Sequence, residues 1–231
     1  MRNFSTKVAG IGLATTMALA VQSSAQAFDF DFSSGDGGFT SSGSPAWTYT
    51  GSQWQTNGQT NGENFLTSPV LTSNINAPIS ISLTHTNSLE ESSSPTGSLW
   101  DAGIVEYSIN GGAFSYFDSS DLYQQSKLTA TGNPISATHG RIPAFSGITP
   151  NRLSSGQDGS LDVGDEFQIR LRTGWDGSIL RSDPAWEVSS ISINESSATL
   201  VPFGVSTDLS ILILGGLYGA SRLRKKLAAN K

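Results

Sequence analysis

The stretch "GIVEYSINGGAFSYF", residues 103–117, decides the fold because it places a tight turn between two strand-like segments. Its centre, Asn110-Gly111-Gly112, consists of residue types that adopt the positive φ angles of a hairpin turn. The apolar residues on both sides are those expected of half-buried strands. The stretch therefore predicts an antiparallel hairpin.

Apolar side chains also repeat with a period of two in other parts of the chain. In "EFQIRLR", Phe167, Ile169 and Leu171 share one face of a strand. Further candidate strands are residues 28–32, 46–50, 64–71, 79–85 and 185–193. Long helical periodicity is absent before Asp208. We therefore expect an all-β fold, a jelly-roll-like antiparallel β-sandwich over residues 28–198, with long loops at 88–98 and 119–152.

Composition and charge exclude several classes of protein. The 231 residues contain no Cys, so disulfides, thiolate metal sites and cysteine nucleophiles are absent. Residues 28–200 hold six basic and 18 acidic residues, a net charge of −12. A surface this acidic repels phosphate backbones, and we expect no nucleic-acid partner.

Residues 1–27 have the three parts of a secretory signal peptide. Arg2 and Lys7 give the positive first part, and an uncharged stretch of small and apolar residues follows. The sequence Ala25-Gln26-Ala27 matches a cleavage site, so we expect the mature chain to begin after Ala27. The uncharged stretch covers about 21 Å as a helix, too short for a membrane anchor that must cross about 30 Å.

Residues 199–231 form a tail with a Pro-Phe motif, an apolar segment and a basic cluster in that order. As a helix, residues 203–223 extend about 31 Å, which is long enough to cross a membrane. The cluster should keep its end in the cytoplasm, because positive residues remain on that side. It consists of Arg222, Arg224, Lys225 and Lys226. The tail therefore predicts one C-terminal membrane helix in the inner membrane.

This tail resembles the PEP-CTERM type of sorting signal, in the variant that carries Pro-Phe-Glu. Pro202 and Phe203 match the variant, while Gly204 stands where it has Glu. The resemblance implies processing by an exosortase, a membrane transpeptidase-like enzyme, and a surface protein associated with exopolysaccharide. The alternative is an ordinary single-pass anchor, for which only length and apolarity matter.

The middle segment loosely resembles MAM-like and related jelly-roll modules of secreted proteins. The resemblance is carried by "NFLTSPVL", "ISLTHTNSLE", "DAGIVEYSINGG", "FQIRLRTGWDGS" and "PAWEVSSISI". It implies an adhesive, carbohydrate-binding or accessory domain, in some cases with a structural calcium ion. Ser189 and Ser190 stand where such modules often have an acid, which weakens the calcium expectation.

Motifs for catalysis are missing from the sequence. His85 and His139 are the two histidines, and neither lies in a metalloprotease or nucleophile-elbow motif. Four acids form possible glycosidase pairs or, as the commoner explanation, are solvated loop acids: Glu90, Glu91, Asp101 and Glu106. We expect no enzymatic activity.

Two loops are rich in the oxygen ligands that Ca²⁺ prefers. One carries Asp29, Asp31, Ser33 and Asp36, and the other carries Asp158, Asp162 and Asp165. Neither has the spacing of an EF-hand. A structural calcium ion is therefore possible, but the sequence assigns no metal ligand.

Aromatic side chains could stack on sugar rings, although most are expected to fill the core. Trp175 is the best candidate for an exposed ring, because it follows a strand and lies among turn residues. The sequence thus predicts an exported surface protein of structural or adhesive type, with a carbohydrate-binding module for extracellular polysaccharide as the alternative. An aromatic row on a sheet face would favour carbohydrate binding, and aromatics in the core would favour the structural role.

Overall fold

The computed structural model describes residues 27–58, 61–94, 97–177 and 183–193. Of the predicted processing residues, Ala27 is described and exposed, directly before the first strand. The rest of the signal peptide and the tail with Pro202, Phe203 and the basic cluster lie outside the described residues. Within the described residues, no helix has the length and apolarity of a membrane span.

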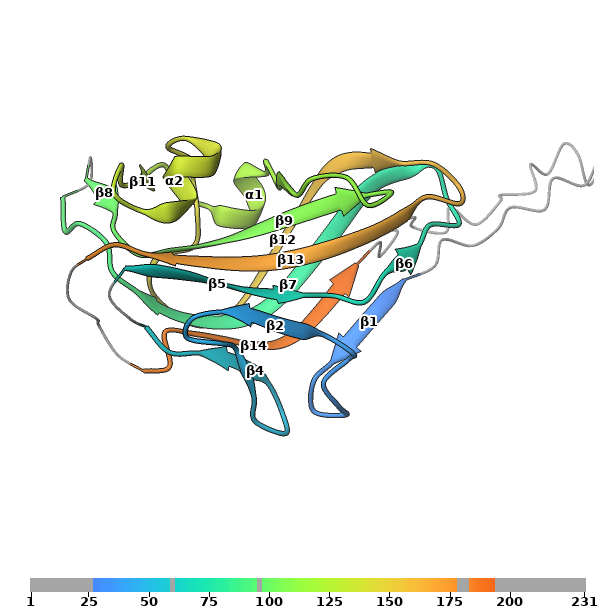
Figure 1. Ribbon diagram of the computed structural model, residues 1–231, viewed down its shortest axis with the longest axis horizontal. Helices are drawn as coiled ribbons and strands as arrows, with labels where there is room; N and C mark the ends of the chain where they lie inside the picture. The colour runs from blue at the N-terminus through green and yellow to red at the C-terminus, as the bar shows by residue number, and fades with distance from the viewer. Residues whose placement is uncertain (1–26, 59–60, 95–96, 178–182, 194–231) are drawn as a thin grey trace, which may run out of the picture.

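Two sheets form a sandwich, and we call them sheet A and sheet B (Figure 1). Sheet A contains, in spatial order, β12 (Gly147–Leu161), β7 (Ala77–Leu89), β14 (Trp186–Ile193), β4 (Trp54–Thr56) and β3 (Thr48–Tyr49), and β1 (Phe28–Asp31) also pairs with β14. Sheet B contains β10 (Ser115–Tyr116), β9 (Ala102–Ile109), β13 (Glu166–Trp175), β5 (Gly62–Thr67) and β2 (Thr40–Gly43), and β6 (Leu71–Thr72) also pairs with β13. All pairs within the two sheets are antiparallel. The prediction of an all-β sandwich is confirmed.

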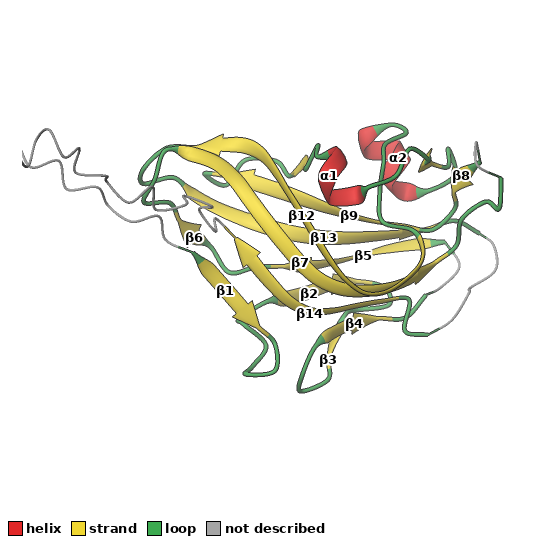
Figure 2. Cartoon of the chain, turned by 180° about the vertical axis from the view of Figure 1, so that it is seen from behind, coloured by secondary structure: helices red, strands yellow, loops and turns green. Residues whose placement is uncertain are grey.

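Smaller elements lie along one side of the sandwich in both views (Figures 1 and 2). They are α1 (Ser120–Tyr123), α2 (Pro134–His139) and the parallel pair β8 (Ser98–Leu99) and β11 (Leu128–Thr129). Asn133 caps α2, because its side chain accepts a hydrogen bond from the backbone N–H of Ile135 at 2.9 Å. Ile135 packs into a small second core with Ile104, so α2 covers part of the outer face of sheet B.

The predicted hairpin is present. β10 pairs with β9, with Ser115 opposite Tyr107, and the turn between them contains Asn110 at φ 53° and Gly111 at φ 70°. These are the left-handed conformations that Asn and Gly tolerate best.

The main core lies between the two sheets. In β7, Ile79, Ile81 and Leu83 are buried, while the intervening side chains are partly exposed. The sheets approach closely where Gly103 of β9 faces Trp186 of β14. A Cβ atom at Gly103 would lie 2.6 Å from the indole ring, so only Gly fits there without displacement.

The segment 119–152, which the sequence analysis predicts as a long loop, contains α1, β11, α2 and the start of β12. β12 is the 15-residue edge strand of sheet A, and its sequence "GITPNRLSSGQDGSL" lacks an apolar alternation. A strand with one partner and one largely exposed face needs few apolar residues, which explains why the pattern did not predict it.

The two ends of the described domain lie side by side. β1 runs antiparallel to β14, with Phe28 opposite Ile193 (Figure 1). The predicted cleavage site at Ala27 therefore lies beside the point where the chain continues toward the tail.

Candidate functional site

The outer face of sheet A carries mostly hydroxyl side chains, together with Leu153 of β12 opposite Thr84 and Glu187 of β14 opposite Thr86. Because successive side chains of a strand alternate between faces, the burial of Ile79, Ile81 and Leu83 places their neighbours on the outside. We call this surface the hydroxyl face. It comprises Ser80, Ser82, Thr84, Thr86 and Ser88 of β7, Ser155 and Gln157 of β12, and Ser190 and Ser192 of β14.

Strand register aligns these side chains in rows across the sheet. Ser82 lies opposite Ser155 on one side and Ser192 on the other. Neighbouring strands are about 4.8 Å apart, so three hydroxyl groups follow one another over about 10 Å. The Ser192 hydroxyl donates to Asp29 Oδ1 at 2.7 Å, which extends the row to β1.

A groove of about 340 Å³ opens over this row. It is lined by Ser80, Ile81, Ser82, Ser119, Asp121, Ser155, Gly156, Gln157 and Ser192. Its wall at α1 depends on Gly156, because a Cβ there would lie 2.3 Å from Ser119 Oγ and 2.9 Å from Leu122 Cβ. The missing side chain thus lets α1 approach the edge strand.

The groove suits a ligand with many hydroxyl groups. Each Ser or Thr hydroxyl donates one hydrogen bond and accepts others, and Gln157 and Asp121 add an amide and a carboxylate. No aromatic side chain lines the groove. Its chemistry is therefore hydrogen bonding rather than stacking.

The prediction that Trp175 is exposed is wrong. β13 continues to Trp175, which pairs with Gly62 of β5. Trp175 therefore extends the alternating series of Phe167, Ile169 and Leu171 into the core, where it is fully buried. Its strand is three residues longer than the apolar alternation indicates.

The other tryptophans of the domain, with one exception, are also in the core. Trp47, Trp54 and Trp186 are buried, as predicted for most aromatics. Trp100 is 39% exposed, at the turn between β8 and β9. The described residues thus present one exposed indole rather than an aromatic row.

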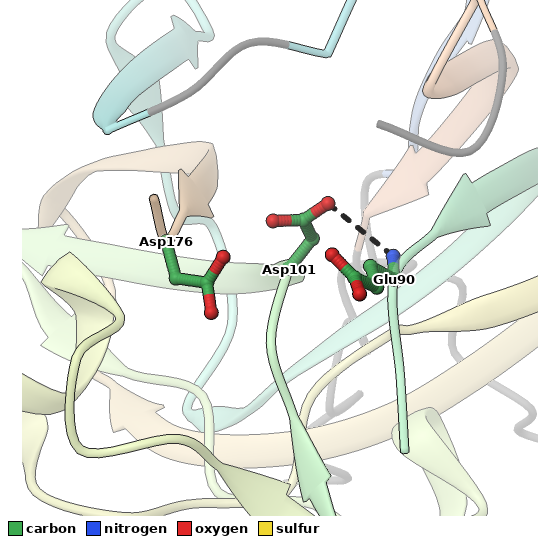
Figure 3. A group of neighbouring side chains, drawn as sticks. All are labelled: Glu90, Asp101 and Asp176. Carbon is green, nitrogen blue, oxygen red and sulfur yellow. Dashed lines mark hydrogen bonds between the residues drawn. The ribbon is translucent and has the colours of Figure 1, made fainter. Parts of the chain in front are cut away.

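Three carboxylates meet at one end of the sandwich, and we call them the acidic cluster (Figure 3). Glu90 directly follows β7, Asp101 directly precedes β9, and Asp176 directly follows β13. One oxygen of each lies within 4.8 Å of the others. Carboxylate oxygens are the ligands that Ca²⁺ prefers, so these three could hold such an ion.

Burial raises the pKa of Asp101 from 3.8 to about 7. Burial is the main cause, and the charges of Asp176 and Glu90 add to it. The backbone N–H of Glu90, 3.4 Å from Asp101 Oδ2, acts in the opposite direction. Asp101 thus carries a proton more readily than an ordinary carboxyl group.

In the two acidic loops singled out from the sequence, the carboxylates accept hydrogen bonds from backbone N–H groups. Asp31 and Asp36 accept hydrogen bonds from backbone N–H groups two residues along the chain. Asp158 accepts from Asp118 and Gly159, and Asp165 accepts from Asp162. Within the described residues, neither loop brings three carboxylates together, whereas the acidic cluster does.

The sequence analysis favours solvated loop acids at Glu106 and Asp101. This prediction is wrong, because both side chains are buried. Glu106 is fully buried in β9 and forms ion pairs with Arg170 and Arg172 at 2.6 and 3.3 Å. Burial would raise its pKa, but hydrogen bonds from Arg170 and His139 and the two arginine charges lower it. Glu91 pairs with Lys127 at 3.5 Å. These contacts hold neighbouring elements together.

His85 lies in the core between two hydrogen-bond partners. Because an indole N–H only donates, Trp186 Nε1 donates to His85 Nδ1 at 3.2 Å. His85 Nε2 then carries the proton and donates to Ser154 Oγ at 2.9 Å. Burial, together with the charge of Arg152, lowers the pKa of His85 to about 4. The partner that orients the imidazole is an indole rather than the carboxylate of a catalytic triad.

No protein-family model matches the chain, and no curated protein matches it. Among solved structures, the C-terminal CBM6 of LamC, a marine laminarinase from Zobellia galactanivorans, is similar at 10% identity and a TM-score of 0.31, over 74% of this chain and 100% of that chain. A mutant of the Emp46p carbohydrate recognition domain is similar at 11% identity and a TM-score of 0.36, over 71% of this chain and 91% of that chain. The metal-free form of that domain has the same identity and TM-score, over 68% of this chain and 87% of that chain. At these scores the similarities carry no argument about function.

Proposed function

We propose that this chain is an exported adhesive protein of the cell envelope that binds extracellular polysaccharide through the hydroxyl face. The observation that carries the proposal is the run of hydroxyl side chains across three neighbouring strands, with a groove of about 340 Å³ above it. Polysaccharides present the complementary donors and acceptors.

The type of contact favours a long polymer over a single sugar. A neutral hydrogen bond contributes about 0.5–1.5 kcal/mol net, because water competes for both partners. A face without stacked rings therefore needs several such bonds at once, and a polymer supplies them with the added benefit of multivalency. This supports an adhesive role for the protein.

The proposed location rests on the two ends of the sequence. Cleavage after Ala27 would release the export signal, and an exosortase would recognise the tail at Pro202 and Phe203 while Arg222, Arg224, Lys225 and Lys226 hold its end in the cytoplasm. The pairing of β1 with β14 supports a tether at one end of the domain, since both chain ends leave from the same place. The hydroxyl face would then be displayed outside the inner membrane.

The alternative function is a carbohydrate-binding module that stacks a sugar on Trp100. The observation in its favour is the 39% exposure of this ring beside Asp101 of the acidic cluster. A single ring provides less contact than the hydroxyl face, so we place it second.

A glycan array separates the two functions. The full-length protein in detergent should bind one or more polysaccharides, and the triple variant Ser82→Ala, Ser155→Ala, Ser192→Ala should bind at least roughly ten-fold more weakly, since it lacks three hydroxyl contacts. The variant Ser115→Ala, which removes an exposed hydroxyl from β10 of sheet B, is the matched control. Unchanged binding of the triple variant together with loss of binding by Trp100→Ala would favour the alternative.

A further inference from the structure

A second, smaller pocket lies next to the groove, and we call it the Arg152 pocket. Its volume is about 80 Å³, more than the roughly 10–15 Å³ that one water molecule requires. It is lined by Asn87, Tyr123, Gln124, Gln125, Phe145, Ser146, Thr149 and Arg152. Arg152 is the one charged residue of this lining.

A β-bulge in the edge strand positions Arg152. Thr149 pairs with Asn87 and Arg152 with His85, so two residues of β12 stay outside the register between these pairs. The second of them, Asn151, has a φ of 34°. Bulges re-aim the side chains of an edge strand, and this one directs Arg152 toward the pocket.

The Arg152 guanidinium is only partly satisfied. Its Nη2 atom is buried and has no hydrogen-bond partner, and no carboxylate of the described residues forms an ion pair with it. By contrast, Arg170 and Arg172 both pair with Glu106. Since a buried N–H group without a hydrogen-bond partner is unfavourable, an oxyanion suits this pocket better than a cation does.

The remaining lining is neutral and held in place. Asn87 Nδ2 donates to the carbonyl oxygens of Ser146 and Gly147 at 3.1 and 2.8 Å, and Gln125 donates to Ala144 O. The Ser146 hydroxyl donates to Asp101 O at 2.7 Å. The polar walls are therefore fixed by the protein, while Nη2 of the guanidinium has no partner within it.

We propose that the Arg152 pocket binds the carboxylate or sulfate group of an acidic sugar. Guanidinium groups bind planar or tetrahedral oxyanions through two parallel N–H donors, and the buried Nη2 atom provides one of them. That this sugar belongs to the polymer on the hydroxyl face rests on the proposed function.

The pocket and the groove are arranged for one ligand. α1 borders both, since Asp121 lines the groove and Tyr123 lines the pocket. Along β12, Arg152 and Ser155 are three residues apart, about 10 Å in a strand, and lie on opposite faces, since Arg152 pairs with the buried His85 and Ser155 with Ser82 of the hydroxyl face. A polysaccharide that passes around this free edge of the sheet can place hydroxyl groups in the groove and an acidic substituent at Arg152.

The acidic surface of the domain, which disfavours nucleic acid with a charge on every phosphate, also weakens the binding of an acidic polysaccharide but acts less on a single local contact. At physiological ionic strength, interactions between exposed charges are largely screened beyond about 8 Å. The short contact at Arg152 therefore determines whether an acidic group binds there. The lining of the pocket holds no acid that would repel it.

The test uses small probes first. We expect the full-length protein in detergent to bind galacturonate and inorganic sulfate but to bind galactose, which lacks the charge, at least about ten-fold more weakly. Arg152→Gln should abolish this difference, Arg152→Lys should retain part of it, and Arg141→Gln, which alters an exposed arginine held by Ser98, should leave it unchanged. The imidazole signals of His85, whose Cα pairs with that of Arg152, should shift on binding while those of His139 should not.

A comparison of polymers then identifies the source of the anion. Stronger binding of polygalacturonate indicates a uronate, stronger binding of a sulfated galactan indicates a sulfate ester, and both support the inference if Arg152→Gln removes the preference over neutral galactan. Binding of neutral galactan alone, equal in wild type and Arg152→Gln, would overturn the anion site and leave the hydroxyl face standing. Sulfate binding that Arg152→Gln does not weaken would overturn it too, and binding of none of these probes would count against both proposals.

Discussion

Replacing Asp101 with Asn should stabilise the protein above pH 7 and change its stability little near pH 4. The pKa of Asp101 is raised from 3.8 to about 7, so the folded protein keeps a proton that the unfolded chain has already released. Stability due to this group therefore falls as the pH rises from about 4, and the loss is complete above about 7. The difference between the two pKa values corresponds to roughly 4 kcal/mol, which Asn at this position avoids.

His85 produces the opposite dependence in the same pH range. Its pKa is lowered from 6.5 to about 4, so below pH 6.5 the unfolded chain binds a proton that the folded protein does not. Stability due to His85 thus falls by roughly 3 kcal/mol as the pH decreases from 6.5 to 4. The two groups partly cancel in the wild type, and only the difference between wild type and Asp101→Asn isolates Asp101.

Urea unfolding between pH 4 and 8, in the presence of EDTA, measures this difference. The free energy of unfolding of Asp101→Asn should exceed that of the wild type by an amount that grows with pH. Asp162→Asn, at an exposed position after β12, should show no such growth. If Asp101→Asn is no more stable than the wild type at pH 8, or if the difference is independent of pH, the assignment of an unfavourable charge at Asp101 is refuted.

Three further predictions concern Gly156, the acidic cluster and the tail. Gly156→Val should destabilise the protein by about 1–3 kcal/mol in urea unfolding and weaken polysaccharide binding, because its side chain collides with the segment at α1; Gly132→Val, with no heavy atom within 4 Å of its Cβ, should do neither. If the acidic cluster holds a calcium ion, Ca²⁺ should raise the unfolding temperature of the wild type but not of Asp101→Asn, and equal shifts would exclude this site. Pro202→Ala with Phe203→Ala should leave export intact and block removal of the tail, as read by intact mass, whereas a retained tail in the wild type would indicate a plain anchor.

The parts of the fold that the sequence predicts are those where burial imposes a strict alternation. β13 is buried on its core side, and its buried residues Phe167, Ile169 and Leu171 form the alternation that predicts the strand. Trp175 was misplaced because the alternation is interrupted by Thr173, a buried polar residue, and Gly174, which packs against Ile135 of α2. Such contacts between distant segments leave no local pattern.

The hydroxyl face corresponds to a pattern in the sequence. In "ISISLTHTNSL", Ser and Thr occupy most of the positions between the buried residues of β7. A strand whose outer positions are almost all hydroxyl groups, rather than charged residues, indicates a specific surface. By contrast, the acidic cluster joins Glu90, Asp101 and Asp176 from three strand ends, and only the sheet register brings them together.

The central claim is that polysaccharide contacts the hydroxyl face, and nuclear magnetic resonance tests it most directly. Isotope-labelled protein is titrated with a soluble fragment of the polysaccharide selected on the array, and the shifted backbone signals are mapped onto the structure. We predict that shifts concentrate at Ser82, Asp121, Ser155 and Ser192, around the groove. Shifts centred on Trp100, or spread evenly over sheet B, would contradict the account.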